Sequence, residues 1–454
     1  MTDIRTMSEK VLILLIERKY KELRELLSDM EPVDIAALTS ELPRDIIPLI
    51  FRVLPKELAA DAFVEMDADL QETLIQAFSD LELKEVLQQL FLDDTVDIIE
   101  EMPANVVKRI LKNSDPSMRQ DINEVLHYPK DSAGSVMTNE YVDLRLRMTV
   151  EDAFKRIKRV AIDRETIYTC YVTDQDRILL GVVTAKTLML SEPDDIIEDI
   201  METNVISSLT TDDKEDCADK ISKYDLLAIP IVDTENRLVG IVTFDDAIDV
   251  IKEATEDDFA KMAAVTPSEN TYFRTGVFAH TKNRVFWLLI LMLSGIVTGA
   301  ILQNFENAIA AIPALVTFIP MLMDTSGNSG TQASTMVIRG LAMEEIHLRD
   351  FIRVWWKEIR VAFCIGVVLG VVNTARILIQ YHGSPERLYF ALATSLTMLA
   401  VVCIAKSFGV ILPMLAKKLR LDPAVVTSPV LTTICDISTV TIYFTLVTIL
   451  FKLS

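Results

Sequence analysis

The stretch Ala424–Leu450, AVVTSPVLTTICDISTVTIYFTLVTIL, decides the architecture of this chain. It is long enough to cross a bilayer, because roughly 20 apolar residues span about 30 Å of hydrocarbon. Asp436 lies near its middle, where a carboxylate costs at least about 2.5–3.5 kcal/mol on insertion scales. Such a charge usually marks a cation or proton pathway that faces the interior of a helix bundle. The stretch therefore predicts a membrane domain built around an ion pathway.

Charge is distributed unevenly along the 454 residues, whose net charge is −22. Residues 271–454 carry a balance of +6, and residues 1–270 therefore carry −28. A soluble acidic half thus precedes an apolar, mildly basic half. The acidity argues against nucleic acid as a partner, because phosphates would be repelled, and it favours cations. The five cysteines and four histidines have no metal-type or nucleophile–base spacing, so we expect no zinc site, no disulfide framework and no enzyme.

Five apolar runs in the second half predict five membrane crossings. Lys and Arg gather before the first run, between the second and third, and between the fourth and fifth, and they are sparse elsewhere. Because cytoplasmic loops carry the excess of basic residues, residues 1–284 are expected in the cytoplasm and the C-terminus outside. The runs cover roughly residues 285–303, 308–340, 358–380, 388–413 and 424–450.

The second run is unusually polar, since it reads FIPMLMDTSGNSGTQASTMVIRGLA at 318–342. Hydrocarbon does not tolerate that density of polar groups, so the segment must face protein or water. The last run repeats the pattern, and two such helices could line a pore. Packing through hydroxyl groups would explain the Ser and Thr residues, but it explains Asp324 and Asp436 poorly. The candidate pore-lining residues are Asp324, Asn328, Gln332, Ser428 and Thr432.

Residues 1–130 are helical by pattern, with apolar residues at three- and four-residue spacing and no glycine. Phrases such as MEPVDIA, LPRDII and LPKELA place Pro or Asp where a helix should begin. This pattern predicts short antiparallel helices stacked as a superhelix, in which neighbours bury each other's apolar faces.

Residues 131–253 contain an internal repeat. Met137 and Met201 lie 64 residues apart, and Gly181 and Gly240 lie 59 apart. Each half reads as helix, strand, turn, strand and helix, which resembles a tandem pair of CBS modules. Such modules usually sense a ligand and gate a neighbouring domain, although a purely structural dimerisation unit is the alternative.

The whole chain resembles the MgtE family of magnesium channels. PMLMDTSGNSGTQASTMVIRGLA and LDPAVVTSPVLTTICDISTVTIYF are similar to the second and last crossings of that family, and DSAGSVMT at 131–138 and ATEDD at 254–258 also match. The resemblance implies a superhelical magnesium-sensing domain (1–130), CBS module 1 (131–199), CBS module 2 (200–253), a connecting helix (254–282) and a five-helix pore domain (283–454).

The resemblance also implies a homodimer in the bacterial inner membrane, with the pore on the subunit interface. Paired Asp436 carboxylates would hold a hydrated Mg²⁺, which prefers oxygen ligands and gives up water reluctantly. The connector departs from the family, because Ile-Lys precedes Glu253 where acids are usual. Further Mg²⁺-binding residues implied by the resemblance are Asp61, Asp93, Asp97, Gly134, Glu215, Asp225, Asp246, Asp249, Glu253, Glu256, Asp257, Asp258 and Asp422.

These acids lead to a gating hypothesis. At low cytosolic Mg²⁺ the acidic interfaces repel and the connector relaxes, whereas at high Mg²⁺ bridging ions draw them together and close the pore. Each ion contributes only its differential affinity for the closed state, so several sites are needed. A transporter of Co²⁺ or Mn²⁺ is the alternative within the same class. A membrane receptor whose CBS pair binds an adenine nucleotide is the alternative from another class.

Overall fold

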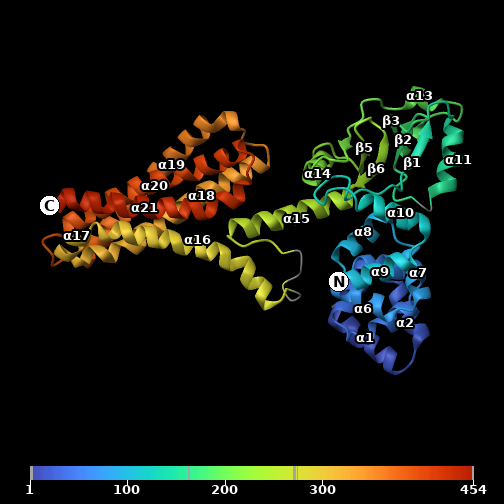
Figure 1. Cartoon of the computed structure of the whole chain (residues 1–454), viewed down its shortest axis with the longest axis horizontal. Coiled ribbons are helices and arrows are strands. Elements are labelled where there is room, and N and C mark those ends of the chain that lie inside the picture. Colours follow the sequence, from blue (N-terminus) through green and yellow to red (C-terminus); the bar gives the residue numbers. More distant parts are fainter. Residues whose placement is uncertain (1–3, 162–163, 269–271, 273–274, 452–454) are drawn as a thin grey trace. The chain divides into compact units, whose positions relative to one another are not determined.

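The computed structural model (Figure 1) describes residues 4–161, 164–268, 272 and 275–451, and the side chains of all of these except 425–429. The chain forms two compact units, Met1–Ala254 and Thr255–Ser454. Each unit has a hydrophobic core of its own.

The first part of the first unit is all helical, as its sequence pattern predicts. Its helices are α1 (Ile4–Ile16), α2 (Tyr20–Ser28), α3 (Pro32–Ser40), α4 (Ile47–Val53), α5 (Lys56–Val64), α6 (Ala68–Ala77), α7 (Asp80–Leu87), α8 (Leu92–Glu101), α9 (Ala104–Asn113) and α10 (Pro116–Val125). Proline stands in the first turn of α3, α4 and α10, where its missing N–H costs no helix hydrogen bond. Helices two apart contact each other from α1 to α9 and from α2 to α6, which gives the stacked superhelix.

The CBS pair follows as two small three-stranded sheets. Its elements are β1 (Val142–Arg145), α11 (Val150–Val160), β2 (Thr169–Thr173), β3 (Leu179–Thr184), α12 (Ala185–Leu190), α13 (Ile197–Ile200), β4 (Ser208–Leu209), α14 (Lys214–Lys223), β5 (Ala228–Val232), β6 (Leu238–Thr243) and α15 (Phe244–Met262). In each sheet the first strand is parallel to the second and the second is antiparallel to the third. The internal repeat is therefore a structural repeat.

In each module, a glycine in the third strand packs closely against a methionine that belongs to the other module. A Cβ on Gly181 in β3 would lie 2.8 Å from the Sδ of Met201, and one on Gly240 in β6 would lie 2.8 Å from the Sδ of Met137. The residue after each methionine exchanges backbone hydrogen bonds with the residue after the opposite glycine. Only glycine allows this approach, so the repeated Met and Gly residues are among the contacts that join the modules.

Helix α15 runs without interruption from Phe244 to Met262, because no Gly or Pro occurs within it. The boundary expected between residues 253 and 254 therefore falls inside a helix. The expected connector 254–282 contains the end of α15, a segment without helix among its described residues, and the beginning of the next helix.

The second unit is a bundle of long helices. Its elements beyond α15 are α16 (Val277–Gln303), α17 (Glu306–Ala311), η2 (Pro313–Phe318), α18 (Ile319–Ala342), η3 (Leu348–Asp350), α19 (Phe351–Gln380), α20 (Arg387–Lys418) and α21 (Pro423–Phe451). Helix α20 lies at the centre, since it packs against α18, α19 and α21.

Among the described residues, four helical segments are long and apolar enough to cross a membrane: Val277–Gln303, Leu348–Gln380, Arg387–Lys418 and Val430–Phe451. Helix α18 spans 24 residues but does not reach the same hydropathy, because of the polar residues in its middle. The structure therefore does not confirm the prediction of five crossings, because only four segments among the described residues meet the length and hydropathy of a membrane span.

Polar groups inside the bundle are paired across helices. Lys406 on α20 is only 4% exposed, and its Nζ lies 3.0 Å from the Oε2 of Glu358 on α19. The Nδ2 of Asn373 on α19 donates to the Oγ1 of Thr394 on α20 at 2.8 Å. A charge or amide buried in a membrane protein needs such a partner, so these pairs fix how α19 lies on α20.

Candidate cation sites

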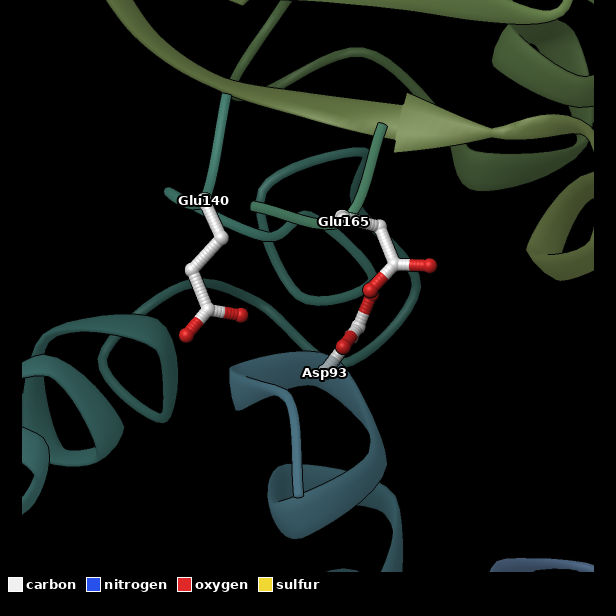
Figure 2. A group of neighbouring side chains, drawn as sticks. All are labelled: Asp93, Glu140 and Glu165. Carbon is white, nitrogen blue, oxygen red and sulfur yellow. The ribbon is translucent and has the colours of Figure 1, made fainter. Parts of the chain in front are cut away.

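Three carboxylates meet where the superhelical domain contacts the first CBS module (Figure 2). Asp93 lies in the first turn of α8, Glu140 precedes β1, and Glu165 lies between α11 and β2. One oxygen of each lies within 4.8 Å of the other two. We call Asp93, Glu140 and Glu165 the three-carboxylate cluster.

Local hydrogen bonds position two members of the cluster. The Oε2 of Glu140 accepts from the backbone N–H of Leu92 at 3.0 Å and from the Oγ1 of Thr138 at 3.2 Å, so it binds to the beginning of α8. The Oδ1 of Asp93 accepts from the backbone N–H of Asp94 at 3.0 Å. The backbone N–H groups of Leu92 and Asp94 lie at the N-terminus of α8 and have no partner within the helix, so they favour negative charge there.

The cluster is electrostatically unfavourable without a cation. Burial, with the nearby charge of Asp246, raises the pKa of Asp93 well above its usual range. Burial and the neighbouring Asp94 raise the pKa of Glu165 to about 8. Asp94 itself is half-buried, and this partial burial, with the nearby charge of Asp246, raises its pKa to about 7. These groups therefore either keep some of their protons near neutral pH or need a compensating cation when they ionise together.

The donor set fits a hard divalent cation. The Oε2 of Glu165 is buried and has no hydrogen-bond partner, and Asp93 is only 8% exposed. In the described part of the chain, no ion pair joins any member of the cluster to a lysine or arginine, and the charge of Arg164 only lowers the pKa of Glu140, which burial raises more strongly. Three carboxylates from separate elements are the kind of oxygen ligands that Mg²⁺ or Ca²⁺ takes.

The structure brings some of the predicted acids to this cluster. Asp246, in the first turn of α15, lies close enough to raise the pKa of both Asp93 and Asp97. Its Oδ2 accepts from the Oγ1 of Thr243 at 2.6 Å, which caps α15. Asp249 follows one turn later and in turn raises the pKa of Asp246, although burial is the larger cause.

Other predicted ligands of the first unit lie apart from the cluster. Asp61 is on α5, where partial burial and Glu57 raise its pKa. Glu215 is in the first turn of α14, and Asp225 is in a turn with φ of 52°. Gly134 donates its N–H to the carbonyl oxygen of Thr210 at 3.0 Å.

Sequence reasoning did not find Glu140 and Glu165. Both are single glutamates in loops, far from Asp93 along the chain, and no spacing rule connects them. Only the docking of α8 against the CBS module places them beside Asp93.

The connector acids are held by lysines. The Nζ of Lys214 lies 2.7 Å from the Oε2 of Glu253. The Nζ of Lys261, in the last turn of α15, lies 3.0 Å from the Oδ2 of Asp422 and 3.9 Å from that of Asp257.

Two further predicted ligands, Glu256 and Asp258, also lie on α15. The side chain of Glu256 is exposed, and that of Asp258 is half-buried.

The predicted pore residues fall on one stripe of α18. Asp324, Asn328 and Gln332 are exposed at four-residue spacing, and the Nδ2 of Asn328 donates to the Oδ1 of Asp324 at 3.1 Å. The opposite face, with Ser326 and Ser329, is buried against the bundle.

The remaining predicted pore residues lie on α21. Asp436 and Thr432 are half-buried, whereas the side chain of Ser428 lies outside the described residues.

A CBS-like pair joined to a bundle of long apolar helices that carries an exposed polar stripe defines a multi-domain membrane transport protein. Family profiles match this division: "MgtE intracellular N domain" at residues 30–131, "CBS domain" at 197–253 and "Divalent cation transporter" at 319–446. The magnesium transporter MgtE of Thermus thermophilus is 34% identical over 96% of each chain, and that of Bacillus subtilis is 33% identical over 97% of this chain and 96% of its own. The chain therefore belongs to the MgtE family of magnesium transporters.

Solved structures agree for the soluble part. The cytosolic domain of the Mg²⁺ channel MgtE in complex with ATP is 34% identical, with a TM-score of 0.51 over 54% of this chain and 99% of that one. The soluble part of a magnesium transporter is 30% identical, with a TM-score of 0.52 over 56% and 99%. These relatives are transporters and not enzymes, as the sequence indicated.

Proposed function

We propose that this protein is a homodimeric, Mg²⁺-selective channel for magnesium uptake across the bacterial inner membrane. The observation that carries the proposal is the exposed stripe of Asp324, Asn328 and Gln332 on a helix otherwise packed into the bundle. Lipid would not accept this stripe, so it faces water or a second subunit. A two-fold interface would bring two such stripes together and line a hydrated path.

Asp436 is the proposed ion-binding residue of that path. It lies on α21, which packs against α18 and α20. Two carboxylates, one from each subunit, suit an ion that keeps most of its water and accepts only a few protein oxygens. In this arrangement α18 is the second of five crossings and adds to the four more apolar helices, and residues 1–284 are cytoplasmic, as the distribution of Lys and Arg indicates.

Cytosolic Mg²⁺ is the proposed gating ligand. The three-carboxylate cluster joins two domains through acids that repel one another when ionised, and a bound cation would hold the domains together. The connector helix α15 begins beside this cluster at Asp246, so closure of the cluster is transmitted along it. Since one relative was solved with ATP, an adenine nucleotide at the CBS pair is a further proposed ligand.

The channel assignment is tested with the full chain in liposomes that enclose a Mg²⁺-sensitive dye. Asp436→Asn should reduce Mg²⁺ uptake to background, while Glu386→Gln, an exposed carboxylate beyond the bundle, should conduct as the wild type does. Normal uptake by Asp436→Asn would refute the pore assignment. Faster uptake of Co²⁺ or Mn²⁺ than of Mg²⁺ would instead favour the alternative cargo.

A further inference from the structure

The last turn of α15 is joined to the first turn of α21 by one lysine. The Nζ of Lys261 lies 3.0 Å from the Oδ2 of Asp422, and the Oδ1 of Asp422 accepts from the backbone N–H of Ala424 at 2.8 Å. Asp422 thus caps α21 while it binds α15. Because α21 also carries Asp436, this contact connects the connector directly to the helix that bears the proposed ion site.

Lys261 is the counter-ion of a small acidic group. Asp257 lies 3.9 Å from its Nζ, and Asp258 is near enough to Asp422 for that carboxylate, after burial, to raise the pKa of Asp258. Burial is the largest single influence on Lys261 and lowers its pKa, but the hydrogen bond to Asp422 and the negative charges of Asp422, Asp257 and Asp258 together raise the pKa of the lysine. Three carboxylates therefore share a single ammonium group, which leaves the group negative by two charges.

A second lysine acts similarly near the middle of α15. Lys214 is mostly buried and holds the Oε2 of Glu253 at 2.7 Å. By contrast, no lysine or arginine among the described residues forms an ion pair with the three-carboxylate cluster, although the charge of Arg164 lies near enough to lower the pKa of Glu140. The connector acids are therefore already partly neutralised without any metal, and they do not simply repel when Mg²⁺ is scarce.

We propose that Lys261 is a tethered counter-ion that keeps α15 on α21 and that competes with a divalent cation for Asp422 and Asp257. This inference rests on the proposed function. A tethered ammonium has one charge and a divalent ion has two, so the ion replaces the lysine when its concentration is high enough. The lysine thereby sets the Mg²⁺ concentration at which the connector responds.

The test measures the cytosolic Mg²⁺ concentration that half-closes the full-length channel in liposomes. Lys261→Met keeps the length and removes the charge, and it should lower that concentration about two- to fivefold, the range of a partly exposed ion pair. Lys252→Met is the matched control, because Lys252 is exposed on the same helix and is expected to leave the value unchanged. Lys261→Arg should behave as the wild type.

A double variant tests whether Lys261 acts through Asp422. Adding Asp422→Asn to Lys261→Met removes the ligand for which the two cations compete, so the half-closing concentration should rise to the wild-type value or above it. An unchanged or higher value in Lys261→Met alone would overturn the proposal. If Lys261→Met does not assemble, Lys261→Gln replaces it in the same comparison. A wild type that conducts no Mg²⁺ would refute the proposed function, whereas a conducting wild type with no shift in these variants refutes only the role of Lys261.

Discussion

Gly409 of α20 and Gly330 of α18 touch backbone to backbone, since a Cβ on Gly409 would lie 2.6 Å from the carbonyl oxygen of Gly330. Ala333 and Ser334 of α18 crowd the same point, at 2.9 and 3.1 Å. Small residues commonly allow membrane helices to approach this closely. The contact fixes the buried face of α18, and it thereby determines that Asp324 and Asn328 lie on the other side.

Gly409→Ala should therefore destabilise the bundle by about 1–3 kcal/mol, the usual range for overpacking. The added methyl meets backbone atoms, which cannot move aside as a flexible side chain could. Thermal unfolding in detergent measures the effect. Gly383→Ala is the control, because a Cβ there would have nothing within 4 Å. Equal melting temperatures for the two variants would show that α18 and α20 do not pack as described.

Glu165→Gln should weaken the binding of Mg²⁺ to the soluble half by about tenfold or more, which corresponds to about 1.4 kcal/mol. The substitution keeps the shape of a side chain whose buried Oε2 has no other partner. Calorimetric titration of residues 1–262 checks the prediction. Asp194→Asn, an exposed acid of the same CBS module, should bind as the wild type does. The cluster is not a cation site if both variants bind equally well.

The soluble half should lose stability as pH rises when divalent ions are removed with a chelator. The pKa values of Asp94 and Glu165 are raised to about 7 and about 8 in the folded chain, so this chain binds more protons folded than unfolded. The corresponding stability is fully present below the usual carboxyl pKa of about 4, and it is lost progressively as pH rises from there through about 7 and 8. Denaturant unfolding at about pH 5.5 and 8.5 measures it, and Mg²⁺ should restore the loss at the higher pH. A free energy of unfolding that rises with pH would contradict the burial of these acids.

Deleting residues 1–253 should leave a channel that no longer closes at high Mg²⁺. This deletion removes the three-carboxylate cluster and Glu253 but leaves Lys261, Asp422 and the bundle. Uptake by the truncated and full-length proteins is compared across a series of Mg²⁺ concentrations on the cytosolic side. Closure of the truncated channel at the same concentration as the full chain would place the sensor elsewhere.

Most of the domain order could be read from the sequence, because each part has its own periodicity and composition. Met137, Met201, Gly181 and Gly240 marked the repeat in the sequence, but only the structure shows that these residues contact one another between the modules. The polar second run indicated that α18 cannot face lipid. Boundaries were less certain, since α15 contains no breaker at the expected limit and continues from the CBS module into the connector.

The sequence by itself determined the acidic soluble half, the apolar half and the costly Asp436, because hydropathy and charge act locally along the chain. Only the tertiary structure decided which acids meet. Glu140 and Glu165 join Asp93 through the docking of separate domains, and Asp422 and Glu253 are engaged by lysines that spacing rules do not connect to them. Electrostatic interactions depend on distance and burial, and these are fixed by packing between segments far apart in the chain.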